Sequence, residues 1–422
     1  MTKTAGRLSL ATVLVLATVT FGAGVAWKSY CAGGNWSDTR QYTTACYSDI
    51  IPLLGTEQLT AGRLPYIDAC AKQDAAGNDL PLCDEYPVLT MYFMRVAASL
   101  SGPSAAGFFW TNVVMLWICA MVVVACCYLL VGRRALYVAL APTLLLSGAL
   151  NWDLFAIALS MVGVLAFFTR RDTRSGACLG LGAAAKFFPA LLVIPLVVDR
   201  VRSREADRGI TMAWSAGAAW LGANIPFALL GLVGWLEFFR FNSSRGADYD
   251  SLWYIAYRLV GGHAYDHTKL INLASAAAFA GLVALIWVLK ARKHPTFARW
   301  TLCFPILVVF LLTNKVYSPQ YSLWLLPWFA LALPNIWGFA AFQVADVLVY
   351  LTRFKWFASL SGVPGTSEWV FETMLGLRAL ALIGCLVAWV WFQAPALPIR
   401  ASPVAAGGKG GETERDSAPI PV

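Results

Sequence analysis

A carboxylate stands just beyond the first hydrophobic segment of the chain. Asp49 lies in the stretch Cys46-Tyr47-Ser48-Asp49-Ile50, a short loop after an apolar run that ends at Trp27. A carboxylate can take the proton from an attacking hydroxyl when it lies within hydrogen-bonding distance. Because most surface acids are only solvated, the alternative is an ordinary residue of a surface loop. We carry both interpretations of Asp49, a general base or a solvated acid.

Three cations have types and positions that suit a phosphate group. Lys186 lies inside an apolar run, and an ionisable residue at membrane depth is a candidate functional residue. A lysine near a helix end can also extend to the membrane surface without any function. Arg245, in the polar segment 242–250, has the planar fork of donors that binds phosphate bidentately. Together with Lys315, these residues are the expected ligands of a lipid phosphate.

A polar run between two late apolar segments suits sugar recognition. It extends from Lys315 to Tyr321 and combines a cation, two phenols and an amide, which a simple connector does not need. Pro319 is expected to fix a turn, while Gln320 and Tyr321 can hydrogen-bond sugar hydroxyls. Trp253 follows the 242–250 segment and suits stacking, although an aromatic residue there also fits a membrane interface.

Histidines add one more possibility for proton transfer. His263 and His267 lie in an expected outer loop, where a lone histidine is usually just at the surface. No metal-ligand spacing is present, so we expect no metal site. The candidate sugar or acceptor ligands form one set: Tyr66, Glu85, Asp153, Asp250, Trp253, His263, Tyr317, Gln320 and Tyr321.

The composition indicates what kind of protein must position these residues. Of 422 residues, 59% are hydrophobic and 13% are charged, about half the charged fraction of a soluble domain. Repeated apolar runs broken by short basic clusters predict an all-α polytopic membrane protein. The net charge of +9 does not imply nucleic acid, because the positive residues lie between apolar runs. No soluble nucleotide-binding signature is present.

Charge and cysteine content predict the topology. The basic clusters around Arg133, Arg170, Arg200 and Lys290 are expected in the cytoplasm. The acid-rich segment from residue 28 to 86 is expected outside, and its four cysteines predict two disulfides whose pairing stays open. Those cysteines are Cys31, Cys46, Cys70 and Cys83.

The apolar runs predict a single membrane-embedded domain, 1–393, with a first extracytoplasmic loop at 28–104. The run 175–198 is basic at both ends, so we expect a hairpin that bends near Lys186 and Pro189. The first run is long and lacks a clear cleavage site, which favours a retained span. Residues 394–422 are expected to be a disordered cytoplasmic tail. The expected segments are 8–27, 105–130, 135–150, 154–168, 175–198, 210–231, 270–290, 300–313, 322–334, 336–351 and 370–392.

The order of the motifs between residues 8 and 392 resembles glycosyltransferase family 87, part of the C-type glycosyltransferase superfamily. The outer-loop Asp49 matches the position of the family's catalytic aspartate. The motifs that carry the resemblance are Gly62-Arg-Leu-Pro65-Tyr66, Glu85-Tyr-Pro87, Asn151-Trp-Asp153, Lys186-Phe-Phe-Pro189, Ser251-Leu-Trp253 and Lys315-Val-Tyr-Ser-Pro-Gln-Tyr321. The four loop cysteines exceed the general pattern of the family, so the acceptor of one member is not assumed here.

The resemblance implies a fold and a reaction. The fold would be a GT-C-type bundle of about 10–12 transmembrane helices. The protein would move a sugar, first mannose and alternatively arabinose, from a polyprenyl-phosphate donor to a lipid-linked or cell-envelope glycan. Transfer would occur with inversion at the extracytoplasmic face of the cytoplasmic membrane. It would use neither a cofactor nor a nucleotide sugar.

Two other classes of function fit a basic, aromatic cavity in a membrane protein. A transporter or flippase of a lipid-linked sugar would have paired repeats and ionisable residues near the membrane midplane. The sequence shows no clear repeat, and its polar residues gather at one face. A non-catalytic scaffold would not need Lys186 inside an apolar run. We therefore expect an enzyme.

Overall fold

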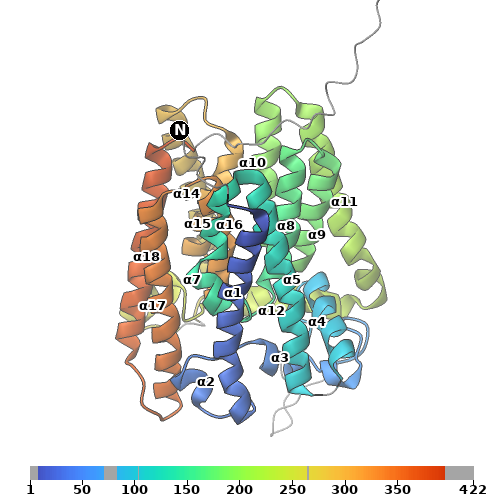
Figure 1. Cartoon of the computed structure of the whole chain (residues 1–422), viewed down its shortest axis with the longest axis vertical. Helices are drawn as coiled ribbons and strands as arrows, with labels where there is room; N and C mark the ends of the chain where they lie inside the picture. The colour runs from blue at the N-terminus through green and yellow to red at the C-terminus, as the bar shows by residue number, and fades with distance from the viewer. Residues whose placement is uncertain (1–7, 71–82, 103, 264–265, 395–422) are drawn as a thin grey trace, which may run out of the picture.

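The computed structural model describes residues 8–70, 83–102, 104–263 and 266–394. Within these ranges the chain is helical and contains no strand, which confirms the all-α fold class. Long helices run side by side in one bundle, and the short helices α2 (Arg40–Thr43) and α3 (Ile50–Thr56) lie at its lower end (Figure 1). The expected tail lies outside the described residues beyond Ala394.

Four helices are long and apolar enough to cross a bilayer, and a bent pair, α11 with α12, meets at 116° and gives a fifth candidate. Several other helices within the described residues are shorter than the roughly 20 residues that a straight crossing of a bilayer core needs. The longer helices are α1 (Leu10–Ser29), α4 (Val88–Ser101), α5 (Ala105–Val131), α8 (Asp153–Phe168), α9 (Asp172–Ala185), α10 (Phe188–Arg202), α11 (Ala206–Leu230), α12 (Leu232–Ser244), α14 (Thr268–Lys293), α15 (Cys303–Thr313), α17 (Ile336–Leu360) and α18 (Glu368–Trp391).

Short helical segments connect these elements. The longer helix α4 was not expected, because the sequence analysis placed residues 88–101 inside the first extracytoplasmic loop. The connecting segments are η1 (Tyr30–Gly34), α2 (Arg40–Thr43), α3 (Ile50–Thr56), η2 (Leu59–Ala61), η3 (Gly132–Ala135), α6 (Leu136–Ala139), α7 (Pro142–Ser147), α13 (Leu252–Leu259), η4 (Arg299–Leu302), η5 (Pro319–Leu325) and α16 (Leu326–Leu331).

The hairpin expected at 175–198 is present as α9 and α10. Lys186 and Phe187 separate the two helices, and Pro189 occupies the first turn of α10, where its missing N–H does no harm. Arg200 at the end of α10 donates to Asp172 at the start of α9 across 2.7 Å. The start of α9 and the end of α10 therefore lie together at one end of the bundle, and the bend at Lys186 lies at the other end of these two helices.

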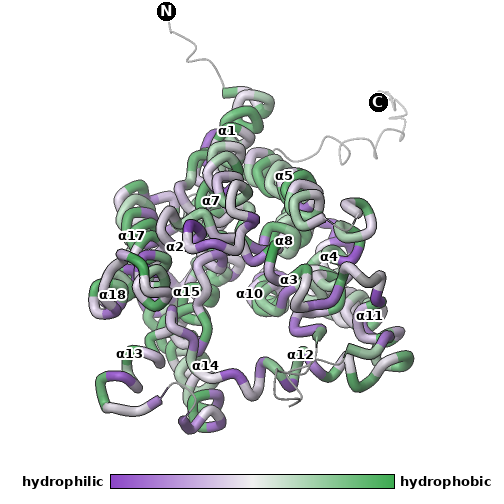
Figure 2. The backbone as a smooth tube through the Cα atoms, turned by 90° about the horizontal axis from the view of Figure 1, so that it is seen from below, coloured by the Kyte–Doolittle hydropathy of each residue, from purple (hydrophilic) through white to green (hydrophobic). Residues whose placement is uncertain are grey.

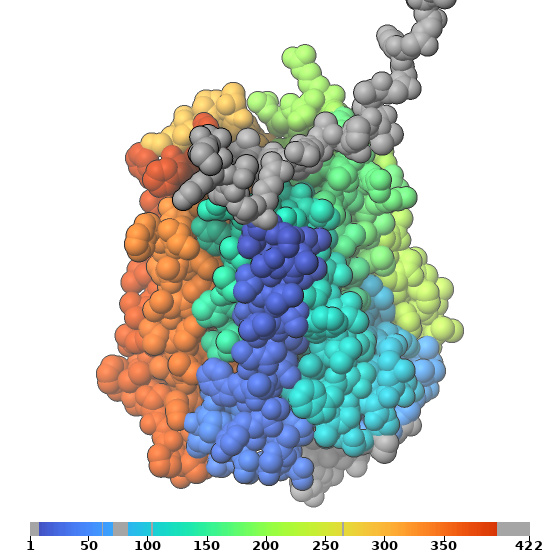
Figure 3. Space-filling model, viewed as in Figure 1, coloured from blue at the N-terminus to red at the C-terminus, as the bar shows by residue number. Residues whose placement is uncertain are grey.

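Other contacts bring further basic residues to that same end, which we call the basic end. Arg208 pairs with Asp172 at 2.6 Å, and the backbone N–H of Arg299 donates to Asp199 at 2.7 Å. The opposite end carries residues 30–70 and 83–87 with both disulfides, and we call it the cystine end. It forms the blue surface at the bottom of Figure 3. Basic and acid-rich segments thus lie at opposite ends, as the charge pattern predicts.

Close packing of α9 against α11 shapes one side of the bundle. An added Cβ would come within 2.1 Å of the Met212 carbonyl oxygen at Gly176, and within 2.2 Å of the Ala216 carbonyl oxygen at Gly180. Only glycine permits this approach of two helix backbones, a common device where helices associate in membranes. The approach fixes the spacing of the helices that border the candidate site.

Candidate active site

A cavity of about 870 Å³ opens within the cystine end of the bundle. Its walls come from the segment before α3, the α9–α10 bend, α12, the segment between α15 and η5, and the last turns of α17. Figure 2 looks toward this end of the molecule. The cavity brings together seven residues predicted from the sequence: Asp49, Glu85, Lys186, Arg245, Lys315, Gln320 and Tyr321.

Asp49 is held at the cavity by hydrogen bonds to its backbone N–H and to its carboxylate. Its backbone N–H donates to the carbonyl oxygen of Leu150 at 2.9 Å, and the neighbouring Ser48 hydroxyl donates to the Ala149 carbonyl at 2.8 Å. The Asn151 amide donates to Asp49 Oδ2 at 2.8 Å and to the Tyr86 hydroxyl at 2.8 Å. The carboxylate is half-buried, so it is oriented and still accessible.

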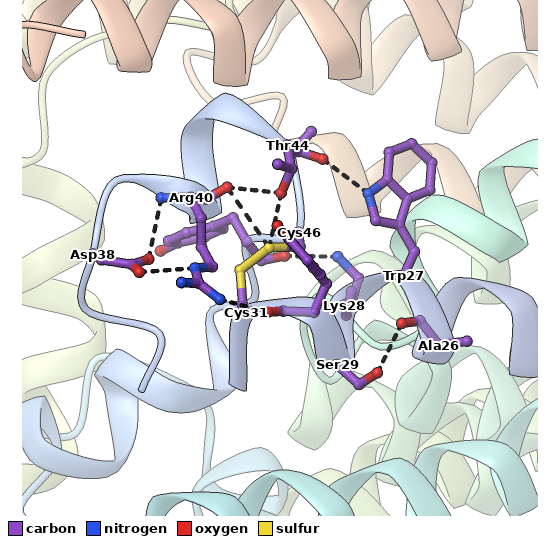
Figure 4. Close-up of a disulfide and its surroundings, with 12 residues drawn as sticks. Ala26, Trp27, Lys28, Ser29, Cys31, Asp38, Arg40, Thr44 and Cys46 are labelled. Carbon is purple, nitrogen blue, oxygen red and sulfur yellow. Dashed lines mark hydrogen bonds and ion pairs between the residues drawn. A yellow bond between two sulfur atoms is a disulfide. The ribbon is translucent and has the colours of Figure 1, made fainter. Parts of the chain in front are cut away.

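The segment that leads to Asp49 is fastened to the end of α1. A disulfide joins Cys31 to Cys46, three residues before Asp49 (Figure 4). Lys28 donates to the Tyr47 carbonyl at 2.6 Å and to the Tyr350 hydroxyl at 3.0 Å. The second disulfide joins Cys70 to Cys83. The prediction of two disulfides is confirmed, and the first of them limits how far Asp49 can move.

Lys186 forms an ion pair with a buried carboxylate, that of Asp153. Its Nζ lies 3.0 Å from Asp153 Oδ2, and Trp324 Nε1 donates to Asp153 Oδ1 at 2.6 Å. The Asp153 side chain is 0% exposed. Lys186 also lies over the Tyr321 ring, 4.8 Å from its centroid. Asp153 therefore orients Lys186 and supplies its counter-charge, while the lysine faces the cavity.

Hydrogen bonds join the chain segment that contains Arg245 to the segment that contains Lys315. Lys315 Nζ donates to the Arg245 carbonyl at 2.5 Å, and the Asp248 N–H donates to the Lys315 carbonyl at 2.8 Å. Arg245 pairs with the Asp248 carboxylate at 2.9 Å. Lys315 is 7% exposed and has no carboxylate partner among the described residues. Burial, together with the nearby Arg245 cation, lowers the pKa of Lys315 to about 8.

The 315–321 run contributes Gln320 and Tyr321 to the cavity wall. The Tyr321 ring stacks on Trp324 with 4.3 Å between centroids, and Pro319 begins the η5 helix. Tyr317 of the same run turns away, since its hydroxyl bonds to Ser322 at 3.1 Å and the Arg378 guanidinium covers its ring at 3.6 Å.

Other predicted sugar ligands lie outside the cavity lining. Tyr66 is buried, and its hydroxyl donates to the Tyr86 carbonyl at 2.7 Å. Trp253 donates to the Thr313 carbonyl at 2.8 Å. His263 is exposed in the loop between α13 and α14. Tyr317 and the buried Asp153 also lie outside this lining. Contact of these side chains with a sugar stays a prediction.

Asp250 also lies behind the cavity wall, and it holds a cation that sequence reasoning missed. Arg353 Nε donates to both Asp250 oxygens, at 3.1 and 2.8 Å, and Arg353 lines the cavity. Burial raises the pKa of Asp250 to about 6, and the Arg353 guanidinium opposes that shift. The signal in the sequence was weak, because Lys186 lies inside an apolar run whereas Arg353 follows one at its end.

An apolar groove of about 380 Å³ adjoins the cavity between α9, α10, α11 and α12. Its walls include Ala183 from α9, and Ala213 and Trp220 from α11. The groove and the cavity share Tyr86, Pro87, Phe187, Phe238 and Phe239. A molecule with a charged head and an apolar chain could therefore occupy both spaces at once.

A sequence profile of glycosyltransferase family 87 matches residues 85–319, more than half of the chain. The chain belongs to this family. The match spans the segments that contribute Glu85, Lys186, Arg245 and Lys315 to the cavity. The protein is therefore a multi-pass membrane glycosyltransferase.

Two further comparisons are less informative. Among solved structures, the chain is similar to the crystal structure of ArnT from Cupriavidus metallidurans bound to undecaprenyl phosphate. Their sequences are 13% identical, with 81% of this chain and 76% of that chain covered and a TM-score of 0.38. This likeness is too distant to assign roles to residues. No curated protein matches the sequence.

The arrangement defines what the cavity of this family member can do. It presents three half-buried carboxylates, Asp49, Glu85 and Asp248, with several cations and aromatic rings next to an apolar groove. Within the described residues, no three His, Cys, Asp or Glu side chains gather in a way that could hold a metal ion. The side chains themselves can accept a proton at Asp49 and neutralise a phosphate near Lys315.

Proposed function

We propose that the protein transfers a sugar, with mannose as the first candidate, from a polyprenyl-phosphate donor to a lipid-linked or cell-envelope glycan. The proposal includes an active site on the extracytoplasmic face of the cytoplasmic membrane. The observation that carries it is the continuity of the charged cavity with the apolar groove through Tyr86, Pro87, Phe187, Phe238 and Phe239. A polyprenyl chain would lie in the groove, while its phosphate reaches the cations of the cavity.

The phosphate would lie nearest Lys315. Among the cavity cations, Lys186 and Arg245 already have carboxylate partners at 3.0 and 2.9 Å. Lys315 has none within the described residues, and a buried cation without a partner gains most from a bound anion. Lys186 and Arg245 would add donors to the remaining phosphate oxygens.

The reaction would proceed as a single displacement. Asp49 takes the proton from the acceptor hydroxyl as its oxygen forms a bond to C1 of the sugar. The bond from C1 to the phosphate oxygen breaks on the opposite face, which inverts the anomeric centre. The polyprenyl phosphate leaves with the bonding electrons, and Lys315 stabilises the charge that develops on it.

Transfer is favoured over transport of an unchanged lipid-linked sugar. A transporter needs no general base, whereas Asp49 is oriented by Asn151 at 2.8 Å and fastened by a disulfide nearby. Membership in a glycosyltransferase family supports the same choice. Arabinose remains the alternative sugar, because none of these contacts distinguishes it from mannose.

The decisive experiment is Asp49→Asn in a reconstituted assay with radiolabelled polyprenyl-phosphate mannose. Loss of a general base should lower kcat by roughly 100- to 10,000-fold, with donor binding retained. Asp207→Asn makes the same chemical change at an exposed site of α11 near the basic end and should leave the rate unchanged. Wild-type turnover by a folded Asp49→Asn protein would exclude the proposed base.

A further inference from the structure

One wall of the cavity is aromatic, and none of its rings lines the apolar groove. Tyr47 from the segment before α3, Tyr249 before α13, and Phe354 and Phe357 from α17 line it. Tyr47 lies 5.3 Å from Phe354 between ring centroids, and Tyr249 lies 5.8 Å from Phe357. Within this wall Phe354 is fully buried, while Tyr249 is 40% exposed. We call these four rings the aromatic wall.

Arg353 completes the aromatic wall with unused donors. Its guanidinium lies 4.5 Å from the centroid of the Phe357 ring, and its Nε makes both bonds to Asp250. Its two terminal nitrogens make no hydrogen bond within the described part of the chain. Ring faces accept the apolar C–H face of a sugar, and planar N–H donors bind its hydroxyls.

The local charge excludes an anion as the occupant of this wall. Asp250, Asp248 and Asp49 all act electrostatically on Arg353. Because Asp248 also pairs with Arg245, three carboxylates face two cations there. The unpaired positive charge of the cavity lies instead at Lys315. An anionic ligand would meet net repulsion at the aromatic wall, whereas a neutral polyhydroxyl ligand would not.

Asp49 stands at the edge of the aromatic wall. Tyr47 precedes Asp49 by two residues and lines the same cavity. Burial, followed by the charge of Asp49, raises the pKa of Tyr47 well above its usual range. The phenol therefore stays neutral and keeps its proton. A ring seated on the aromatic wall would have its hydroxyls beside the carboxylate.

We propose that the aromatic wall and Arg353 form the acceptor subsite, and that it takes a neutral sugar residue whose hydroxyl points to Asp49. This inference rests on the proposed transfer reaction and specifies its acceptor. The acceptor ring that receives the new bond carries no phosphate or carboxylate of its own. Any charged part of a larger acceptor lies beyond the aromatic wall.

The test uses saturation-transfer NMR on the full chain in lipid nanodiscs. The probes are methyl α-D-mannoside and its C6-carboxylate analogue, and undecaprenyl phosphate binding is measured in parallel. Tyr249→Ala should weaken mannoside binding about threefold to tenfold and leave undecaprenyl phosphate binding unchanged. Trp337→Ala is the matched control, because Trp337 is an exposed aromatic residue in the first turn of α17, at the other end of that helix.

The outcomes separate this inference from the proposed function. Equal mannoside binding by wild type and Tyr249→Ala, or carboxylate binding as tight as mannoside binding, overturns the acceptor subsite. Failure of the wild type to bind undecaprenyl phosphate argues against the donor and leaves the subsite standing if Tyr249→Ala still matters. Arg353→Lys keeps the charge that Asp250 needs and should also weaken mannoside binding, which guards against a folding defect in one variant.

Discussion

Lys315→Gln tests the assignment of the donor phosphate most directly. Lys315 is 7% exposed and bonds only to the Arg245 carbonyl, so its removal strands no buried carboxylate. A hydrogen bond to a charged group contributes about 1.5–3 kcal/mol. Its loss should weaken polyprenyl-phosphate binding by roughly tenfold to 150-fold. Stability should fall by only about 1 kcal/mol, because glutamine can still bond to the carbonyl.

The assay is equilibrium binding of undecaprenyl phosphate to protein in nanodiscs, combined with thermal unfolding. Lys315→Arg should bind like the wild type, and Lys269→Gln, at an exposed site near the start of α14, controls for lost charge. Unchanged affinity in a folded Lys315→Gln protein would refute the assignment.

The pH profile gives a second readout for Lys315. Its pKa is lowered to about 8, so the cation that binds phosphate is lost as pH rises through that value. The kcat/KM of the wild type, which reports the free enzyme, should fall above about pH 8. Lys315→Arg should not show this fall, because arginine stays protonated. A shared profile would contradict the role of Lys315.

Three other changes probe the supports of the site. Lys186→Met leaves Asp153 buried without its cation and should destabilise the protein by about 3–5 kcal/mol. Adding Asp153→Asn to the same protein should largely reverse this loss of stability in thermal unfolding. If the second substitution restores nothing, the two residues are not coupled. Ala213→Trp should fill the apolar groove and weaken undecaprenyl phosphate binding about tenfold but leave a ten-carbon prenyl phosphate unaffected, and equal losses for both would place the chain elsewhere. Cys31→Ser with Cys46→Ser opens a 15-residue loop, which should cost about 3 kcal/mol and speed proteolysis near Asp49; unchanged protection would show that other contacts suffice.

Some features of the site could be read from local sequence, and others could not. Lys186 was recognisable because a charge inside an apolar run is unusual wherever the chain folds. Arg353 is also a charged residue beside an apolar run, but it follows the end of that run, where a side chain that extends to the membrane surface is the ordinary explanation. Asn151 was visible only as a loop amide, and its bond to Asp49 spans a sequence separation of 102 residues. Asp153 was predicted to be a sugar or acceptor ligand, whereas the fold buries its side chain beneath Lys186.

The sequence by itself determined the properties that depend on neighbouring residues. Hydropathy and charge along the chain specify a helical membrane protein, a cystine-containing end opposite a basic end, and the hairpin at Pro189. These follow from local solvation and backbone sterics. Only the tertiary structure decided which side chains share one cavity, how the cysteines pair, and which lining cation lacks a counter-charge. Those outcomes depend on helix packing and burial across long sequence separations, which no local pattern encodes.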